Sequence, residues 1–463
     1  TINEISSFEE YFKILVEENS KYNLTAITSK EEVYYKHFLD SGLVLNYLDL
    51  TNKSVCDVGS GAGFPGIVLK ILCPSIKLYI IEPIGKRCNF LKMLCEKLKL
   101  DNVVIINDRA ENIKEYRNYF DLLIIDEAQK APELFPELER IVNESRLKLG
   151  DSKSNGLYIL SGSQRKKLLD NSKESLSGRV AILDMSNLSI NEIFNRKNTP
   201  FEVNIDKISD RVNNFYIDET KAFELIVRGF FPILLTDNEM KTQTFYSSYI
   251  TTYLEKDLKE LIAINDEIKF INFLKLLASN TGEELIYDNY SKQVGVSTNT
   301  IKSWISVLVT TGIIYLVEPY NENSIVKRIV KRPKMYFFDT GLAAYLCGID
   351  SAKTLQNSFL KGRFFETFIF NELRKSYLNN GEMQSLYYYR DNDQNEIDFV
   401  LLRKGMLSCI EIKTGQVFNA SSTKGFKKLA NTKYLKGKNA IICTASKLSI
   451  LNDETIILPI SAI

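Results

Sequence analysis

A run of glycines directly after a short apolar segment restricts the fold of this chain more than any other feature. Residues 54–58 have the apolar pattern of a buried strand and lead into the sequence DVGSGAGFPG over residues 57–66. Glycines let the backbone turn tightly and approach a ligand before the helix expected over residues 67–72, whose N-terminus favours an anionic or polar group. The pattern predicts a ligand-binding turn, although the glycines could also simply permit close helix packing.

The following segments continue the alternation of strands and helices. A strand is expected over residues 77–81 and is followed at once by Glu82, where folds of this type place an acid that binds both ribose hydroxyls. A helix through residues 90–98 leads to a third strand over residues 103–106. This order predicts the first half of a Rossmann-like sheet, and its spacing suits S-adenosylmethionine or a dinucleotide about equally.

Four motifs of this part resemble the ribosomal RNA small subunit methyltransferase G family, also called glucose-inhibited division protein B. In the family's order they are NLTAI at 23–27, HFLDS at 37–41, the glycine loop, and RAE at 109–111, and the resemblance covers residues 5–120. It implies an S-adenosylmethionine-dependent enzyme that methylates guanine N7 in 16S rRNA, with 16S rRNA or the small ribosomal subunit as its partner. The implied cofactor contacts are Gly59, Gly61, Phe64, Glu82, Ala110 and Glu111. His37 is interpreted first as a structural histidine.

The resemblance ends near residue 120. Residues 120–125 plausibly begin the family's fourth strand, but Asp126 occupies the position of an arginine that helps to bind the cofactor in the family. The rest of the family's sheet and its target-guanine pocket are not recognised beyond this point. We therefore expect cofactor binding to be retained better than methyl transfer.

Four apolar residues followed by Asp126 and Glu127 have the pattern of a Walker B strand, in which the aspartate holds Mg²⁺ and the glutamate polarises water. The same pattern is also common in ordinary buried strands. With the sequences GLYILSGSQ at 156–164 and ESLSGRV at 174–180, it resembles an AAA-type ATPase family that carries a winged helix and a nuclease-like C-terminal domain of unknown function. This resemblance implies a sensor role for Ser163 and Gln164 and a charge-stabilising role for Arg179, although Arg179 could equally be a surface residue. No Walker A motif occurs, so ATP hydrolysis is not expected.

Residues 283–338 have the pattern of a helix-turn-helix with a wing. Helices are expected over 290–294 and 299–310, and strands over 313–317 and 334–338. A local basic cluster could contact DNA phosphates: Lys327, Arg328, Lys331, Arg332 and Lys334. A protein-interaction module with a solvated charged loop is an equal alternative.

The C-terminal part carries a constellation typical of restriction-endonuclease-like domains. Glu366 lies on an expected helix, Asp398 on an expected strand, and Glu411 and Lys413 on the next strand, where the period of two puts both on one face. In such sites carboxylates hold Mg²⁺, here Asp398 and Glu411, while the lysine steadies the attacking water. Ordinary surface pairs, or a fold kept as a binding platform, are the alternatives.

Composition narrows the remaining possibilities. With 59 Lys and Arg against 58 Asp and Glu, the chain has a formal charge of +1, so any nucleic-acid contact must be local. Seven scattered cysteines and a single histidine argue against a zinc site and suggest reduced thiols in the cytoplasm. No segment is apolar enough over a sufficient length to predict a membrane span.

The expected fold is α/β: a partial Rossmann-like methyltransferase sheet merging into a partial P-loop ATPase core, then a winged helix and a restriction-endonuclease-like domain. The corresponding segments are 1–120 (methyltransferase-like half domain), 121–200 (truncated ATPase core), 201–282 (helical linker), 283–345 (winged helix) and 346–463 (nuclease-like domain). Each half lacks residues that its family needs, so we interpret the chain as a recombination product or a sequence-assembly chimera. The first expected function is 16S rRNA (guanine-N7) methylation. The alternatives are an ATPase-family protein with a nuclease-like domain acting on DNA, or an inactive interaction protein.

Overall fold

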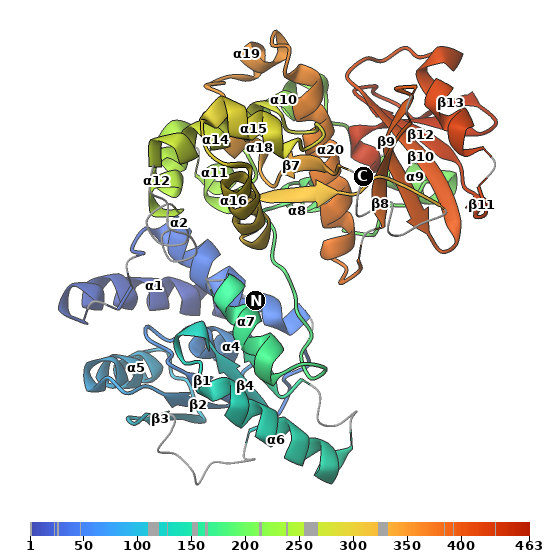
Figure 1. Cartoon of the computed structure of the whole chain (residues 1–463). Coiled ribbons are helices and arrows are strands. Elements are labelled where there is room, and N and C mark those ends of the chain that lie inside the picture. Colours follow the sequence, from blue (N-terminus) through green and yellow to red (C-terminus); the bar gives the residue numbers. More distant parts are fainter. Residues whose placement is uncertain are drawn as a thin grey trace. The chain divides into compact units, whose positions relative to one another are not determined.

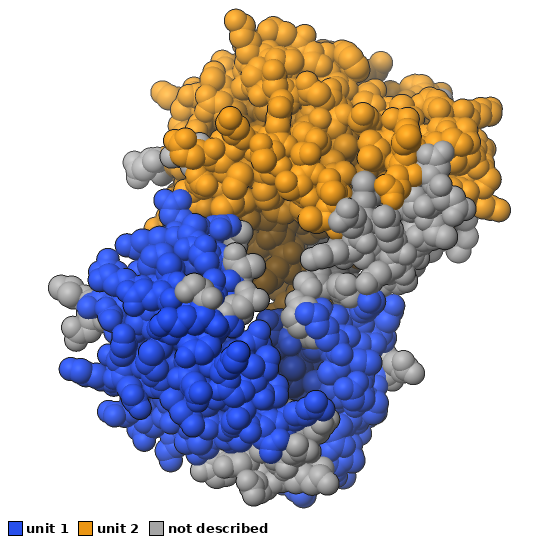
Figure 2. Space-filling model, turned by 90° about the vertical axis from the view of Figure 1, so that its left-hand side faces the viewer, with its two compact units in different colours: residues 1–181 blue, residues 182–463 orange. Residues whose placement is uncertain are grey.

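The structure is a computed structural model that describes residues 2–463 except 23, 26, 47, 110–119, 127, 151–155, 163, 164, 213, 214, 238, 254–266, 323–331, 384, 392 and 431. The chain divides into two compact units, residues 1–181 (unit 1) and residues 182–463 (unit 2), which are coloured separately in Figure 2. Each unit has its own sheet and core, and each is described by itself.

Unit 1 is built around a five-stranded parallel sheet (Figure 1). The strands are β1 (Ser54–Val58), β2 (Lys77–Ile81), β3 (Val103–Ile106), β4 (Leu122–Ile125) and β5 (Tyr158–Leu160), and their order is β3-β2-β1-β4-β5. The central strand β1 pairs in parallel with β2 on one side and with β4 on the other. This arrangement confirms the predicted Rossmann-like parallel sheet, and the first three strands have the predicted bounds.

Alternating apolar side chains bury both faces of this sheet, as expected of parallel strands between helices. On one face, Val55 and Leu78 share a core with residues of α1 (Ile2–Tyr22), α4 (Gly66–Leu72) and α5 (Gly85–Lys97). On the other face, Ile125 packs against Phe135 and Leu138 of α6 (Leu134–Leu149). A further helix, α7 (Arg165–Ser175), packs against α6.

The strands β4 and β5 come from the segment with the ATPase-like pattern, yet they extend the sheet that β1–β3 begin. β4 pairs with β1 through Val58 and Ile125, and β5 pairs with β4 through Leu160 and Ile125. The strands β4 and β5 therefore contribute to the methyltransferase-like sheet. A P-loop ATPase core remains a prediction.

Unit 2 begins with helices that surround a two-stranded sheet. The helices are α8 (Ile190–Ile193), α9 (Ile205–Val212), α10 (Glu219–Arg228), α11 (Pro232–Thr236), α12 (Thr242–Tyr253), α14 (Glu267–Ser279), α15 (Tyr287–Val294), α16 (Thr298–Thr310), α18 (Thr340–Leu346), α19 (Ala352–Gln356) and α20 (Lys361–Leu378). Ser297 caps α16, and Gly295 ends α15 with φ of +72°. The strands β6 (Ile314–Val317) and β7 (Lys334–Phe337) pair antiparallel. The two helices, the turn and the two strands occur in the predicted order, with α15 beginning at Tyr287 and not at residue 290 and the other bounds shifted by one residue at most, whereas their function as a winged helix remains a prediction.

A mixed sheet forms the rest of unit 2. Its strands are β8 (Leu386–Arg390), β9 (Glu396–Arg403), β10 (Met406–Lys413), β11 (Leu435–Lys436), β12 (Asn439–Cys443), β13 (Ser449–Asn452) and β14 (Thr455–Pro459). The order is β13-β14-β12-β10-β9-β8, and β11 pairs with β10. The short 3-10 helices η8 (Ala420–Leu429) and η9 (Ile460–Ala462) follow β10 and β14. The long helix α20 packs against β10 and β7, so one end of this sheet lies close to the β6–β7 hairpin.

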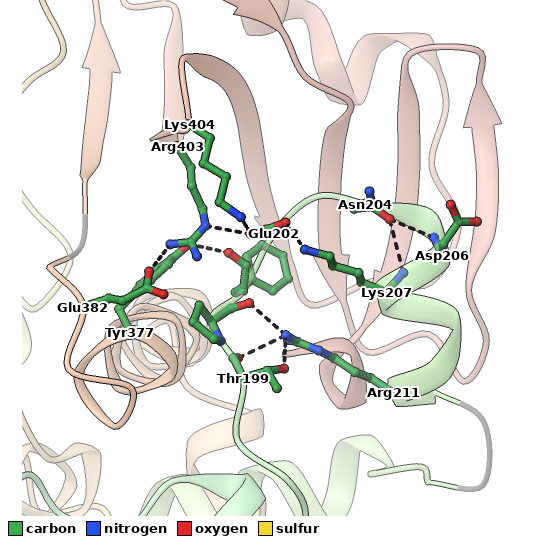
Figure 3. Close-up of polar contacts among 12 residues, drawn as sticks. Thr199, Glu202, Asn204, Asp206, Lys207, Arg211, Tyr377, Glu382, Arg403 and Lys404 are labelled. Carbon is green, nitrogen blue, oxygen red and sulfur yellow. Dashed lines mark hydrogen bonds and ion pairs between the residues drawn. The ribbon is translucent and has the colours of Figure 1, made fainter.

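Charged contacts fasten the segment before α10 onto α20 and the mixed sheet. Lys375 and Glu372 of α20 form a buried ion pair of 3.0 Å, and they also bind the backbone at Leu188 and Ile190. Figure 3 shows a second attachment, where Glu202 faces the basic side chains at the end of β9. These contacts explain why residues 186–212 belong to unit 2.

Two predictions from the sequence, on membrane spans and on the cysteines, concern both units. Among the helices that the structure describes, none combines the length and the apolar character that crossing a membrane requires. All seven cysteines lie in described positions and are free thiols, five of them buried.

Candidate functional site

Three residues directly follow three neighbouring strands of unit 1 and lie at the same edge of its sheet. Gly59 follows β1, Glu82 follows β2 and Asp126 follows β4. The last residues of these strands, Val58, Ile81 and Ile125, are partners in the parallel register. Parallel α/β sheets bind ligands outside the carboxyl ends of their strands. This edge is therefore the candidate cofactor site.

The glycine loop and the end of β2 are joined by hydrogen bonds. The Gly59 amide donates to the Ile81 carbonyl oxygen at 2.8 Å, and the Gly61 amide donates to the Glu82 carboxylate at 3.0 Å. The second oxygen of Glu82 accepts from the Ile84 amide at 2.9 Å. These two bonds use two of the roughly four acceptor positions of the carboxylate, which is 1% exposed and lies 4.0 Å from the Arg87 guanidinium.

Open space lies over the first glycine of the loop. Gly59 has φ of +78°, and a Cβ built on it would meet no other atom within 4 Å. Gly61 also has a positive φ, of +56°, so both positions favour glycine for the backbone conformation. The loop thus turns back over the strand end and leaves room for a ligand next to its backbone.

The buried carboxylate of Asp57 binds the glycine loop at Ser60 and the start of α4 at Gly66. One of its oxygens accepts hydrogen bonds from the Ser60 hydroxyl at 2.6 Å and from the Gly66 amide, the first of α4, at 2.9 Å. Burial, together with the charges of Asp126 and Glu82, raises the pKa of Asp57 to about 7, although the two hydrogen bonds oppose this shift. The side chain is 1% exposed.

Aromatic residues support the loop from α1 and from the segment before β1. His37 stacks on Phe64 with ring centroids 4.2 Å apart, and its Nε2 lies 3.2 Å from the Thr25 hydroxyl. Tyr11 stacks on Phe64, packs at a tilt against Phe38 and donates a hydrogen bond to the Ala62 carbonyl oxygen at 2.7 Å. The packing of His37 within this cluster agrees with its interpretation as a structural histidine. Phe64, predicted to contact the cofactor, is half-buried in the same cluster.

Asp126 gives the candidate site a negative charge at the end of β4. Its side chain is exposed and accepts a hydrogen bond from the Ser161 hydroxyl, which follows β5. Its charge is among the causes that raise the pKa of Asp57. Of the three acids at this sheet edge, Asp126 is exposed, whereas Asp57 and Glu82 are each 1% exposed.

Several predicted residues are not brought into this site by described contacts. Ala110, Glu111, Glu127, Ser163 and Gln164 lie outside the described residues. Arg179 lies beside α6, where its guanidinium donates to Asn143 at 2.7 Å and pairs with Glu139 at 3.4 Å.

A second cluster in unit 2 brings together the four residues of the predicted nuclease-like constellation. Asp398 on β9 is buried, and its carboxylate accepts from the Ile412 amide of β10 at 2.7 Å. Burial and the charges of Glu366 and Glu411 raise the pKa of Asp398, whereas nearby lysines oppose this shift. The Lys413 ammonium donates to Glu411 at 2.6 Å. We call Glu366, Glu396, Asp398 and Glu411 the acidic cluster.

Lys334 occupies a different place from the one its sequence position suggests. We expected it in an exposed basic cluster, but it is 3% exposed and pairs with Glu396 at 2.6 Å and with Glu366 at 3.1 Å. Strand period two points its side chain toward α20 and β9, so it faces carboxylates and not solvent. Lys327, Arg328 and Lys331 lie outside the described residues, and Arg332 is exposed. Sequence reasoning also missed Glu396, because an ion pair across 62 residues leaves no local pattern.

The acidic cluster does not fit a divalent cation as it is folded. Among the residues that the structure describes, no group of three or more His, Cys, Asp or Glu side chains has an arrangement that could hold a metal ion. The lysine ammonium groups of Lys334 and Lys413 instead supply the positive charge. Asp398 and Glu411 as Mg²⁺ ligands therefore remain a prediction without support from the geometry.

The parallel sheet, the glycine loop and the acid after β2 define unit 1 as a Rossmann-like α/β unit. A family model described as rRNA small subunit methyltransferase G matches residues 4–144. The curated ribosomal RNA small subunit methyltransferase G of Oceanobacillus iheyensis is 41% identical over 193 residues, which are 40% of this chain and 77% of that protein. The chain therefore belongs to the ribosomal RNA small subunit methyltransferase G family.

Other comparisons define the extent of the similarity. The enzyme of the same name from Carboxydothermus hydrogenoformans is 51% identical over 121 residues, 26% of this chain, and the chain spans only about half (52%) of that relative. A crystal structure of a SAM dependent methyltransferase from Aquifex aeolicus is 26% identical and covers 26% of this chain and 61% of its own, with a TM-score of 0.20. Models described only as domains of unknown function, DUF8612 and DUF4143, match residues 219–353 and 361–463.

Proposed function

We propose that unit 1 binds S-adenosylmethionine at the carboxyl edge of β1, β2 and β4 and that the protein methylates N7 of a guanine in 16S rRNA. The observation that carries the proposal is the open space over Gly59 next to a Glu82 carboxylate tied to the same loop. Family membership supports the choice of cofactor and of the rRNA substrate.

The residues at this edge match the chemical groups of the proposed cofactor. Glu82 would accept hydrogen bonds from the two ribose hydroxyls, because it lies at the end of β2 with acceptor capacity to spare. The exposed carboxylate of Asp126 would favour the positively charged end of the ligand. S-adenosylmethionine supplies a methyl group on a sulfonium sulfur, and guanine N7 has a lone pair and no proton, so the transfer needs no general base.

Cofactor binding is tested by calorimetry of the full chain with S-adenosylmethionine. We expect Glu82→Gln to weaken binding by roughly tenfold or more, because one hydroxyl acceptor becomes a donor. Glu96→Gln, which changes an exposed glutamate on α5, is the matched control and should bind like the wild type. Absence of binding by the wild-type chain would contradict the proposal.

Methyl transfer needs a separate test, because the chain spans about half the length of the first relatives that it matches. Small ribosomal subunits that lack the modification are incubated with the chain and methyl-labelled S-adenosylmethionine, and the position of the label is mapped on 16S rRNA. Cofactor binding without methyl transfer would support the proposed cofactor site and contradict the proposed rRNA activity.

ATP binding and DNA contact, which the sequence suggests for the other part of the chain, are independent of the proposed methyltransferase function. The sequence has no Walker A loop that could bind ATP. The expected DNA contact through residues 283–345 depends on basic residues that lie mostly outside the described part. A DNA mobility-shift measurement with the full chain tests the second expectation directly.

A further inference from the structure

Lys334 reaches from the β6–β7 hairpin into the acidic cluster of the neighbouring mixed sheet. It is the first residue of β7, and its ammonium group lies 2.6 Å from the Glu396 carboxylate at the start of β9 and 3.1 Å from the Glu366 carboxylate on α20. The side chain is 4% exposed. Three elements that are distant in sequence therefore meet at one ammonium group.

The groups around this ammonium group stabilise its positive charge. The Tyr336 hydroxyl donates to the same Glu366 oxygen at 2.6 Å, and the Tyr388 ring lies 5.7 Å from the Lys334 nitrogen. Burial alone would lower the pKa of Lys334, but the neighbouring carboxylates, led by Glu366, hold it above its usual value. The acidic cluster thus contains four carboxylates and two ammonium groups. The second ammonium group belongs to Lys413, which is paired with Glu411.

A hard divalent cation would compete for the same two carboxylates that this ammonium group contacts, those of Glu366 and Glu396. Such cations take carboxylate oxygens as ligands, and burying carboxylates without a counter-charge is costly. An ammonium group that already contacts two of the four carboxylates competes directly with a metal ion for their oxygens. Among the described residues no three His, Cys, Asp or Glu side chains are arranged to hold a metal ion, so in the folded chain the counter-charge of Glu366 and Glu396 is the Lys334 ammonium group.

We infer that Lys334 is the resident cation of the acidic cluster and that it excludes divalent metal ions, so that removing its charge converts the cluster into a divalent-cation site. The inference concerns unit 2 alone and is independent of the proposed methyltransferase function. Any metal-dependent reaction at this cluster would first require Lys334 to withdraw.

The test measures Mn²⁺ binding to the full chain by electron paramagnetic resonance of the free ion. We expect Lys334→Gln to bind one Mn²⁺ at least roughly tenfold more tightly than the wild type. Lys334→Arg keeps the charge and should bind Mn²⁺ as weakly as the wild type. Adding Asp398→Asn to Lys334→Gln should abolish the gained site, because it removes a buried carboxylate of the cluster.

Thermal unfolding, followed by the fluorescence of the single tryptophan, Trp304 in unit 2, keeps the inference testable if Lys334→Gln is unstable. Without metal this variant leaves its carboxylates uncompensated and should melt below the wild type. Mn²⁺ should raise its melting temperature more than that of the wild type or of Lys334→Arg. Equal Mn²⁺ affinities in all variants, or a Lys334→Gln chain that Mn²⁺ neither binds nor stabilises, would overturn the inference.

Discussion

The hydroxyl of Tyr11 on α1 closes the space over Gly63 in the cofactor loop. A Cβ on Gly63 would lie 2.5 Å from the Tyr11 hydroxyl oxygen, and the glycine has φ of +105°. The same hydroxyl donates to the neighbouring Ala62 carbonyl oxygen. The first helix of the chain thus fixes the loop that the glycine pattern predicts.

We therefore expect Gly63→Ala to destabilise unit 1 by about 1–3 kcal/mol, because alanine brings both a strained φ and a clash with a buried hydroxyl. Hydrogen exchange of the β1 and β2 amides measures this loss. Gly85→Ala is the matched control, since that glycine begins α5 without a positive φ and its Cβ would come no closer than 3.4 Å to another residue. Equal exchange in the two variants would contradict the role given to Tyr11.

The raised pKa of Asp57 predicts an unusual pH dependence for unit 1. In the unfolded chain this carboxyl ionises near its ordinary value of 3.8, whereas in the folded unit it does so at about 7. Between these values the folded state binds more protons, so stability falls as pH rises, by on the order of 1.4 kcal/mol per pH unit at most. Above pH 7 this contribution is constant.

Asp57→Asn should remove this slope, because the amide keeps an acceptor for Ser60 and Gly66 but does not ionise. Amide exchange in β1, corrected for the intrinsic rate, is compared between wild type and variant from pH 4 to pH 8. Parallel stability profiles of the two chains would show that Asp57 ionises normally in the folded unit.

Much of unit 1 can be predicted because its pattern is local. Apolar strands, glycine turns and amphipathic helices follow each other within 120 residues, so strand bounds and the position of Glu82 can be read from the sequence. The strand β4 could not be assigned in this way, because an apolar run before an acid suits either a methyltransferase sheet or an ATPase core. Its pairing with β1 depends on contacts between segments far apart in the sequence.

The unit 2 cluster shows why charge patterns are less informative than strand patterns. Glu366, Asp398, Glu411 and Lys413 could be predicted as a group because a family resemblance relates them. Lys334 could not, since its neighbours in sequence are basic and its partners Glu366 and Glu396 come from other elements. Burial of a lysine is decided by packing that no local sequence reports.

Asp126 provides a test of the charge at the cofactor edge. Its exposed carboxylate should favour S-adenosylmethionine, which carries a sulfonium charge, over S-adenosylhomocysteine, which does not. Asp126→Asn should reduce this preference several-fold, because an exposed charge contributes roughly 1 kcal/mol or less. Calorimetry with both ligands measures the ratio, and an unchanged ratio would place Asp126 away from the bound sulfur.

Glu202 provides a test of how the segment before α9 is held on the mixed sheet (Figure 3). Its carboxylate pairs with Lys207 at 2.6 Å, with Arg403 at 2.9 Å and with Lys404 at 3.0 Å. Although partial burial opposes the shift, these three hydrogen bonds lower the pKa of Glu202 to about 2. The stabilisation is therefore present above about pH 4.5 and is lost as pH falls toward 2.

Glu202→Gln should lower the stability of unit 2 at neutral pH and make it less sensitive to acid between these two values. Urea unfolding followed by Trp304 fluorescence at several pH values measures both effects, because the tryptophan is buried in the core of the same unit. Glu224→Gln is the matched control: that glutamate pairs with Lys221 on the exposed face of α10, where an ion pair contributes about 0.5 kcal/mol or less. If both variants lose stability equally and keep the acid sensitivity of the wild type, Glu202 is an ordinary surface residue and the segment is held by Arg211 and the buried Lys375–Glu372 pair instead.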